Sequence, residues 1–295
     1  MNKQSLSKYY HNTLFAFLPN ICNSSCDFCY VNPLKGKTAI LNKNIVNHFE
    51  ILVKQAKLNG IDTIRITGGE PLIFNNFNEL VLILKQYNLD YTIITNGQEL
   101  FNQLKYIKLF IPKKITVSLH SFINYEKIFK NDIDFSLLFK SLKTLYDKGT
   151  IISISIVYHD LNKSEIDKMI TSFEQLRFIN EVKIIYPNTT KINTDLMISF
   201  AKRNFNSSTI KVRYTDFNQK ECLLKTRGFL SVIVENLKSY NCCTTIGEIE
   251  NETDIDGDFN LSQIMQLQFE NNKQINKFPC KSYINCCPIS LKNSP

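Results

Sequence analysis

Three cysteines near the start of the chain have the residue type and the spacing to bind a metal. Cys22, Cys26 and Cys29 are spaced C-x3-C-x2-C and follow an apolar run at residues 14–18 that predicts a strand. Cysteine thiolate is the usual ligand of iron–sulfur clusters, so this loop can bind three corners of a cubane cluster and leave the fourth iron open. A structural zinc site and three buried thiols remain alternatives. Zinc sites usually pair two C-x2-C-type knuckles, and no second knuckle lies nearby in the sequence.

Composition indicates a globular chain in a reducing compartment. Of 295 residues, 43% are hydrophobic and 21% are charged, which is enough apolar material for a full core. The sequence has no apolar run of transmembrane length, and its polar N-terminus lacks the apolar centre of a secretory signal. We therefore expect a cytoplasmic protein with no membrane partner. In that compartment nine cysteines favour metal ligation or thiol chemistry over disulfides.

The positive charge of the chain is distributed over its length. Lys and Arg total 35 against 27 Asp and Glu, a net charge of +8. A nucleic-acid binder gathers such charge on one face, whereas these lysines are scattered singly through predicted helices. The pattern favours a solvated surface, and nucleic acid is not expected as a partner.

Strands and helices alternate along the first two thirds of the chain. Predicted strands cover residues 14–18, 63–67, 91–94, 114–119, 151–157 and 182–185; predicted helices cover residues 41–59, 77–87, 135–148 and 164–176. The last helix has an N-cap and capping-box neighbours at its start. This rhythm predicts an α/β fold with a parallel sheet and helices outside. Six strands are too few for a closed eight-stranded barrel, so we predict a partial (β/α)6 TIM-like barrel.

Four polar motifs directly follow predicted strands. They are the cysteine loop, Gly-Gly-Glu-Pro at 68–71, Thr-Asn-Gly at 95–97 and Ser-Leu-His at 118–120. Functional residues gather at the carboxyl ends of parallel strands. Composition changes after residue 187, and residues 187–190 have the character of a linker. We therefore predict a barrel domain at 1–186 and a small cysteine-rich C-terminal extension at 187–295.

The two main motifs together resemble the radical S-adenosylmethionine (radical SAM) superfamily. C-x3-C-x2-C with Phe28 before the last cysteine precedes Gly-Gly-Glu-Pro after a strand, and the resemblance covers roughly residues 10–186. It implies that Cys22, Cys26 and Cys29 hold a [4Fe-4S] cluster whose open iron is chelated by the amino and carboxylate groups of S-adenosylmethionine. An electron from a reductant such as flavodoxin or ferredoxin then leads to a 5′-deoxyadenosyl radical, which abstracts a hydrogen atom from the substrate.

The resemblance and the chemistry of the residues suggest which side chains contact S-adenosylmethionine. Glu70 can accept hydrogen bonds from the chelated amino group, glycines permit close approach of the backbone, and proline stiffens the turn. Ser118 matches the place where family members contact the ribose or the carboxylate. Asn96 is either a pocket residue or part of an ordinary Asn-Gly turn, and His120 is either a pocket residue or a structural histidine. The predicted cofactor contacts are Phe28, Tyr30, Gly68, Gly69, Glu70, Pro71, Asn96, Ser118 and His120.

Six further cysteines lie in the C-terminal third. The spacing from Cys222 through Leu237 to Cys242 resembles the SPASM/twitch extensions of radical SAM enzymes, with leucine in place of the glycine of that pattern. Cys280-x5-Cys286 matches a later part, but Lys277 and Ser290 stand where cysteines are expected. We predict one auxiliary [4Fe-4S] cluster rather than two, with a structural zinc site as the alternative. Its predicted ligands are Cys222, Cys242, Cys280 and Cys286, with Cys243 and Cys287 as alternatives.

A cysteine of this region that binds no cluster can donate a hydrogen atom to a substrate radical. Cys222 is the candidate for that role.

Two enzymatic functions compete. The SPASM-like tail favours modification of a ribosomally made peptide by a crosslink, a thioether or an epimerisation. The alternative is a small-molecule enzyme, because residues 64–71 (Ile-Arg-Ile-Thr-Gly-Gly-Glu-Pro) resemble the motif of the molybdenum-cofactor cyclase; a radical dehydrogenase belongs to the same class. The expected basic glycine-arginine tail of that cyclase is not found. With 21 residues before Cys22, a peptide would need the core, the C-terminal region or a separate recognition protein to bind it.

A non-enzymatic iron–sulfur or zinc protein is the remaining alternative. It explains the cysteines but not the Gly-Gly-Glu-Pro motif.

Overall fold

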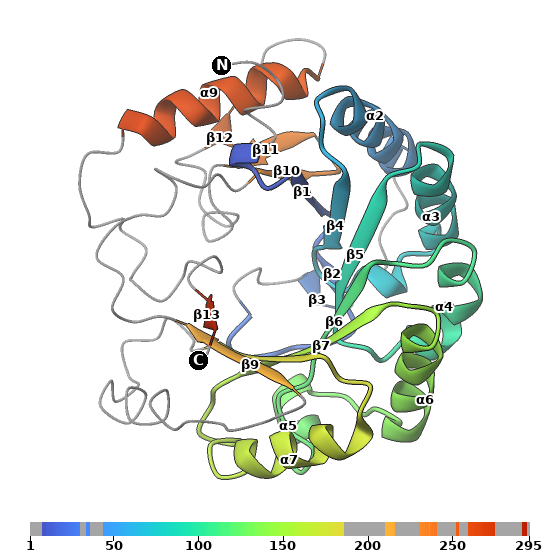
Figure 1. The fold of residues 1–295 in the computed structure, drawn as a ribbon, viewed down its shortest axis with the longest axis vertical. Helices are drawn as coiled ribbons and strands as arrows, with labels where there is room; N and C mark the ends of the chain where they lie inside the picture. The colour runs from blue at the N-terminus through green and yellow to red at the C-terminus, as the bar shows by residue number, and fades with distance from the viewer. Residues whose placement is uncertain are drawn as a thin grey trace.

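One long, curved β-sheet forms the centre of the molecule (Figure 1). The computed structural model describes residues 8–29, 34–35, 44–185, 210–215, 230–235, 237–240, 252–253, 259–274 and 291–293. The six expected strands are all present: β1 (Thr13–Phe17), β4 (Thr63–Thr67), β5 (Asp90–Thr95), β6 (Lys114–Ser118), β7 (Ile151–Val157) and β8 (Glu181–Ile185). They lie side by side in that order, and each neighbouring pair is parallel. The predicted partial α/β barrel is confirmed.

Strands from the C-terminal third extend this sheet at both edges. They are β9 (Lys211–Thr215), β10 (Leu230–Ile233), β11 (Lys238–Tyr240), β12 (Glu252–Thr253) and β13 (Leu291–Asn293). β10 pairs in parallel with β1 and β9 pairs in parallel with β8, whereas β11, β12 and β13 add antiparallel edges. The predicted division of the chain after residue 186 remains a prediction, and strands beyond that point continue the same sheet.

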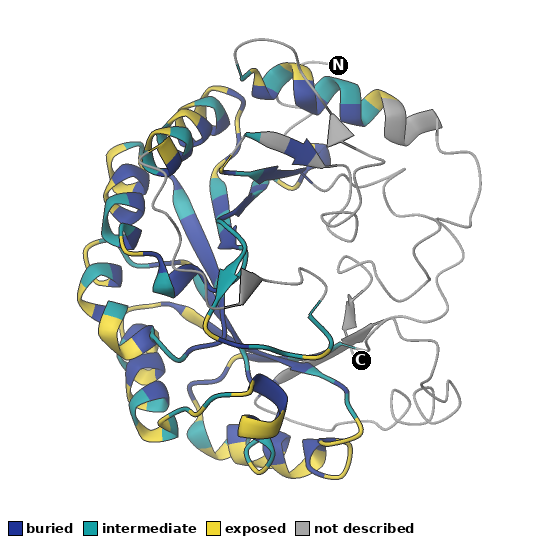
Figure 2. Ribbon diagram, turned by 180° about the vertical axis from the view of Figure 1, so that it is seen from behind, coloured by how far each residue is buried: buried dark blue, intermediate teal, exposed yellow. Residues whose placement is uncertain are grey.

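Helices cover the convex face of the sheet (Figure 1). They are α2 (Asn44–Leu58), α3 (Phe77–Gln86), α4 (Leu100–Ile107), α5 (Tyr125–Phe129), α6 (Phe135–Tyr146) and α7 (Ile166–Leu176), with α9 (Leu261–Gln274) near β10 to β12. In Figure 2 the central strands are mostly dark blue, the colour of buried residues, whereas the outward turns of the helices are yellow. Sequence periodicity missed α4 and α5, which are only 8 and 5 residues long.

The predicted capping box at the start of α7 is wrong. The helix begins at Ile166, and its N-cap residue, Glu165, makes no side-chain capping bond. The Glu165 carboxylate instead accepts hydrogen bonds from the backbone N–H groups of Phe122 (2.7 Å) and Ile123 (3.0 Å) and from the Ser121 hydroxyl. A tertiary contact to the loop after β6 therefore takes the place of a local cap.

The strand residues that alternate with the apolar core positions are polar. Thr92 of β5 lies beside Arg65 of β4 in the strand register. Thr116 of β6 lies beside Ser153 of β7, and Ser153 in turn lies beside Glu181 of β8. This period of two places hydroxyl and charged side chains on the concave face, opposite the helices. A polar inner face is suited to a hydrophilic ligand.

Two strands of the C-terminal third form a hairpin. β10 and β11 are antiparallel, and the turn between them contains Leu237 with φ +58°. His48 of α2 secures this turn, because its Nδ1 atom lies 3.1 Å from the Val234 carbonyl oxygen and 3.0 Å from that of Glu235.

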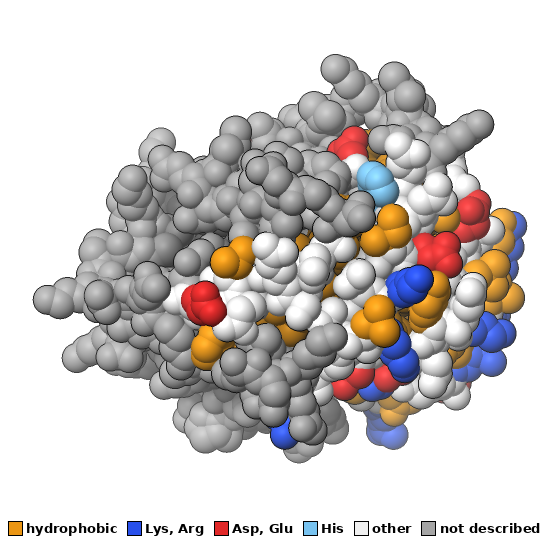
Figure 3. Space-filling view, turned by 90° about the horizontal axis from the view of Figure 1, so that it is seen from above, with side chains coloured by type: hydrophobic (Ala, Val, Ile, Leu, Met, Phe, Trp, Pro, Cys, Tyr) orange, Lys and Arg blue, Asp and Glu red, His pale blue; other side chains and the backbone are white. Residues whose placement is uncertain are grey.

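The surface carries mixed charge. On the described part of the face in Figure 3, lysine and arginine side chains lie among acidic and apolar ones, as the scattered lysines of the sequence predict. No helix among the described residues is long and apolar enough to cross a membrane.

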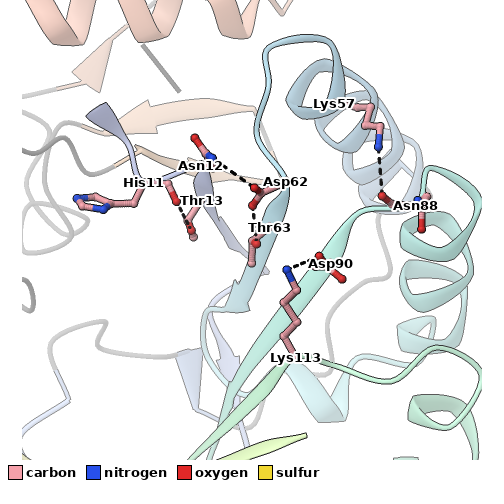
Figure 4. Close-up of polar contacts among 9 residues, drawn as sticks. All are labelled: His11, Asn12, Thr13, Lys57, Asp62, Thr63, Asn88, Asp90 and Lys113. Carbon is pink, nitrogen blue, oxygen red and sulfur yellow. Dashed lines mark hydrogen bonds and ion pairs between the residues drawn. The ribbon is translucent and has the colours of Figure 1, made fainter. Parts of the chain in front are cut away.

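Polar contacts join neighbouring strands at their amino ends (Figure 4). Asn12 donates to Asp62 over 3.3 Å, and Thr63 donates to the same carboxylate over 2.8 Å. Lys113 and Asp90 form an exposed ion pair beside them. These contacts lie at the end of the sheet opposite the predicted site, whose motifs follow the carboxyl ends of the strands.

Candidate functional site

The cysteine loop begins where β1 ends. Cys22 belongs to a two-residue strand, β2 (Ile21–Cys22), which pairs in parallel with β3 (Leu34–Lys35). All three thiols are free and half-buried. The Ser24 N–H group donates to the Cys22 sulfur over 3.3 Å, and the Cys29 N–H group donates to the Cys26 carbonyl over 3.1 Å. Backbone N–H groups of the loop therefore make hydrogen bonds within the loop itself, one of them to a cysteine sulfur.

The chemistry of the three loop thiols is compatible with a cubane iron–sulfur cluster. Burial, together with repulsion from neighbouring thiolates of the loop, raises the pKa of Cys22 to about 11 and that of Cys26 to about 12. Among the described residues, no three side chains of the metal-binding types converge on one ion-sized point. A cubane needs separated thiolates, since each binds a different iron atom.

The Gly68-Gly69 turn allows β4 to touch the chain that leads into Cys22. A Cβ atom on Gly69 would lie 2.0 Å from the Ile21 carbonyl oxygen, and one on Gly68 would lie 2.5 Å from the Leu18 carbonyl oxygen. The Glu70 N–H group donates to the Ile21 carbonyl over 2.7 Å. Both glycines are thus required by backbone contact within the protein. Pro71 follows at the start of a short 3-10 helix, η1 (Pro71–Ile73).

Glu70 is a buried carboxylate that joins the ends of β4 and β5. It accepts hydrogen bonds from the Leu72 N–H group (3.0 Å), the Thr95 hydroxyl (2.6 Å) and the Asn96 N–H group (2.6 Å). Burial raises the pKa of Glu70 to about 7, although these three donors act in the opposite direction. The predicted contact with the amino group of S-adenosylmethionine remains a prediction.

Asn96 extends from β5 to the cysteine loop. Its Nδ2 atom donates to the Asn23 side-chain oxygen (2.7 Å) and to the Ser24 hydroxyl (3.1 Å), and its Oδ1 atom accepts from the Gln98 N–H group (3.1 Å). The side chain therefore binds the loop that carries Cys22, and the turn at Gly97 has φ +84°. The turn is therefore present, and a contact of Asn96 with the cofactor remains a prediction.

His120 is buried at the end of β6. Its Nδ1 atom accepts a hydrogen bond from the Val157 N–H group over 3.1 Å, and its ring stacks on Phe129 with centroids 4.9 Å apart. Burial lowers the pKa of His120 to about 3. Phe28 of the cysteine loop meets the His120 ring edge-on, with ring centroids 5.0 Å apart. Of the predicted cofactor contacts, Phe28 and His120 therefore touch each other. Their contact with the cofactor remains a prediction.

Ser118 ends β6 and is half-buried beside Ser155 of β7. Tyr30 and all six C-terminal cysteines lie outside the described residues. The auxiliary-cluster ligands and the linker at 187–190 therefore stay predictions.

Sequence reasoning missed the polar residues that hold the loop. Asn131, just after α5, donates to the Asn23 backbone carbonyl over 2.6 Å and to the Ser24 hydroxyl over 3.2 Å. It also donates to Gln98 over 2.7 Å. Nothing in the local sequence marks Asn131, because its partners are remote along the chain. Of the amide residues that contact this loop, only Asn96 could be selected from the sequence, because it forms an Asn-Gly pair directly after a strand.

Sequence reasoning also missed charged residues on the concave face. Glu181 pairs with Lys114 two strands away and lies 3.7 Å from Lys183. Arg65 donates to the Thr92 hydroxyl over 3.1 Å, and burial lowers its pKa. These four side chains place more positive than negative charge in this region.

A cysteine-bearing loop lies next to a Gly-Gly-Glu-Pro turn at the carboxyl edge of a parallel partial barrel, where enzymes with this kind of sheet carry their functional residues. The family model described as "Radical SAM superfamily" matches residues 17–173, which is more than half of the chain. The chain belongs to the radical SAM superfamily, and it is an enzyme of the radical SAM type.

Sequence relatives share the core of the chain. It is similar to a "Probable GTP 3',8-cyclase" of Saccharolobus islandicus, at 31% identity over 172 residues, 57% of this chain and 54% of the relative. The "GTP 3',8-cyclase" of Aquifex aeolicus is 26% identical over 207 residues, 64% of this chain and 63% of the relative. The chain thus spans little more than half the length of the curated relatives it matches.

Solved structures share the fold over almost the whole chain. SuiB of Streptococcus suis bound to S-adenosylmethionine has a TM-score of 0.69 at 14% identity, covering 94% of this chain and 72% of that one. SuiB bound to its precursor peptide SuiA has a TM-score of 0.68 at 13% identity, covering 95% and 71%. The structure titled "Native anSMEcpe with bound AdoMet" has a TM-score of 0.61 at 14% identity, covering 93% and 88%. At these identities the likeness concerns the fold alone.

Proposed function

We propose that the chain cleaves S-adenosylmethionine reductively and uses the resulting 5′-deoxyadenosyl radical to abstract a hydrogen atom from a substrate. The supporting observation is the juxtaposition of three half-buried thiols with the β4 turn, in which Glu70 donates its N–H group to Ile21 directly before Cys22. A bound [4Fe-4S] cluster supplies the electron for the cleavage. Cys22, Cys26 and Cys29 hold the cluster, and the β4 and β5 ends fix the loop that carries them.

An anaerobic assay tests this proposal. The reconstituted protein, S-adenosylmethionine and a strong reductant should yield methionine and 5′-deoxyadenosine, both quantified by chromatography. The variant with Cys22, Cys26 and Cys29 all changed to alanine should form neither product. A fully iron-loaded wild type that forms no 5′-deoxyadenosine would refute the radical chemistry.

For the substrate we propose a ribosomally synthesised peptide that receives a crosslink, a thioether or an epimerised centre. The fold likeness to SuiB extends over 94% of the chain, and that protein has been solved with a precursor peptide. A separate recognition protein and a flavodoxin or ferredoxin reductant are the proposed partners.

A small-molecule substrate is the second candidate, because sequence relatives over the core are named GTP 3',8-cyclase or probable GTP 3',8-cyclase. Incubation with GTP and, separately, with any short peptide encoded beside the gene distinguishes the two candidates. Mass spectrometry should find a changed peptide and unchanged GTP. Conversion of GTP with no change in the peptide would overturn the peptide proposal.

We also propose one auxiliary [4Fe-4S] cluster in the cysteine-rich region, with Cys222, Cys242, Cys280 and Cys286 as ligands. The support is the spacing of these cysteines in the sequence. Iron analysis should find about eight iron atoms per wild-type chain and about four in the variant without the three loop cysteines, since each cubane holds four. A folded triple variant that holds no iron would contradict this proposal.

A further inference from the structure

The segment Asn23-Ser24 is held by two amide side chains that come from different parts of the chain. Asn96 reaches it from the end of β5, and Asn131 reaches it from the segment after α5. Both Nδ2 atoms donate to the Ser24 hydroxyl, at 3.1 Å and 3.2 Å. Ser24 is buried, although the residues on either side of it are more exposed. A buried serine with two amide donors on one oxygen indicates a fixed position.

The orientation of both amides follows from partners that can play only one role. Asn131 must direct its NH2 group at the Asn23 backbone carbonyl, because that oxygen can only accept. Asn96 must direct its oxygen at the Gln98 N–H group, because that group can only donate, and its NH2 group then faces the loop. Neither side chain can turn over without losing a bond.

Gln98 completes this arrangement. Its Oε1 atom accepts from Asn131 over 2.7 Å, while its Nε2 atom donates back to the Asn131 oxygen and, over 3.2 Å, to the Tyr125 hydroxyl. The reciprocal amide pair therefore fixes the position of the Asn131 side chain. Lys130, with φ +61°, turns the chain at the end of α5 so that Asn131 reaches this place.

Asn96, Asn131 and Gln98 hold the residue whose backbone N–H group makes a hydrogen bond to the Cys22 sulfur. The Ser24 N–H group donates to the Cys22 sulfur over 3.3 Å. The next N–H group, that of Ser25, donates to the Phe129 carbonyl at the end of α5 over 3.0 Å. The backbone at Ser24 is thus fixed from both sides, and its N–H direction is not free to vary.

We infer that Asn131, supported by Gln98, is a positioning residue for the loop cluster: it keeps the Ser24 N–H group directed at the Cys22 sulfur. This inference rests on the proposed cluster at Cys22, Cys26 and Cys29. Hydrogen bonds to ligand sulfurs favour the reduced, more negative form of a cluster and raise its midpoint potential. Asn131 therefore makes the cluster easier to reduce without touching it.

The test uses two substitutions of Asn131 and one matched control. Asn131→Asp keeps the shape of the side chain but removes its donors, and Asn131→Ala removes the side chain. Asn124→Ala is the control, because Asn124 lies before the same short helix and its side chain donates to the Leu161 carbonyl over 2.9 Å, away from the cysteine loop. Circular dichroism establishes that each variant is folded.

The first readout needs no cluster. In the iron-free full-length protein, hydrogen exchange at the peptide covering Ser24 and Ser25 should become roughly fivefold faster in both Asn131 variants, which is the effect of losing one typical hydrogen bond. The Asn124 variant should exchange like the wild type at this peptide. Gln98→Ala should change the exchange in the same direction and to a smaller extent, and it serves if the Asn131 variants fail to fold.

The second readout is the midpoint potential of the reconstituted cluster, followed by electron paramagnetic resonance during a redox titration. Asn131→Ala, which adds no charge near the cluster, should shift it to more negative values, and Asn124→Ala should not. Unchanged exchange and unchanged potential in Asn131→Ala, in a wild-type background that does load iron, would overturn the inference. A wild type that loads no iron at the loop would instead overturn the proposed function and leave the exchange result to decide whether Asn131 orders the loop.

Discussion

Single residues at the carboxyl edge of the sheet act on the protein's own backbone. The Gly-Gly-Glu-Pro motif is expected from its family to approach a ligand, yet its glycines also give room to the carbonyls of Leu18 and Ile21. The sequence marks these residues but not that contact, because the two segments are far apart along the chain. Motif spacing thus predicts which residues form the site, while the backbone contacts that position them appear only in three dimensions.

Gly69→Ala should destabilise the iron-free protein by about 3 kcal/mol, because the new Cβ atom meets the Ile21 carbonyl and the β1 and β4 ends must separate. Iron uptake by the cysteine loop should fall as well. Gly149→Ala is the control: no atom lies within 4 Å of its Cβ position, and its cost, from φ +93°, should be about 1 kcal/mol. Urea denaturation measures both. Equal costs for the two variants would show that the Ile21 contact is not tight.

His120 should make the iron-free protein less stable in acid. Its pKa falls from 6.5 to about 3 on burial, so below pH 6.5 the unfolded chain takes up a proton that the folded chain does not. Stability from this group is complete above about pH 6.5, and it falls by about 1.4 kcal/mol per pH unit towards pH 3. His120→Gln, which can still accept from Val157, should remove this dependence. Urea denaturation at pH 7 and pH 5 should show a smaller loss in the variant; parallel losses would refute the assignment.

At the scale of elements, periodicity predicts the long units and misses the short ones. The expected strands at 63–67 and 151–157 match β4 and β7 residue for residue, because alternating or continuous apolar residues leave a clear signal. The five-residue helix α5 gives no such signal, yet the chain just after it binds the cysteine loop. The start of α7 was misplaced because a remote loop, and not the helix itself, uses the Glu165 carboxylate.

Glu165→Ala should cost about 3 kcal/mol, because it leaves the Phe122 and Ile123 N–H groups and the Ser121 hydroxyl without their shared acceptor. Gln175→Ala, at an exposed position of the same helix, should leave the free energy of unfolding within about 0.5 kcal/mol of the wild type. Urea denaturation of the two variants compares them directly. A cost for Glu165→Ala no larger than that of the control would mean that the loop does not depend on this carboxylate.

At the scale of the molecule, charge inside the barrel and charge on its rim contribute differently. Lys114 and Glu181 join β6 to β8 across β7 with side chains 19% and 7% exposed, whereas Lys113 and Asp90 are 57% and 41% exposed. The sequence shows no difference between these pairs, because both are ordinary lysine and acid residues at strand ends. Only the curvature of the sheet brings Lys114 and Glu181 together on its inner side.

Glu181→Ala should therefore destabilise the protein by about 3 kcal/mol, since it leaves Lys114 and Lys183 without this anion in a buried region. Asp90→Ala should cost less than about 1 kcal/mol, as exposed pairs do. Urea denaturation in low and high salt should show a salt-sensitive effect for Asp90 and a nearly constant one for Glu181. Equal costs would show that the inner pair is as solvated as the outer one.

The pairing of β10 with β1 has a consequence for synthesis. Leu14 lies beside Leu230, so the strand that leads into the cysteine loop has β4 on one side and a strand from the last third of the chain on the other. On the ribosome β1 can pair with β4 early, but its second edge stays open until residue 233 has emerged. The loop thiols are thus presented on an incomplete sheet for much of translation, until β10 to β12 complete the side of the sheet from which that loop begins.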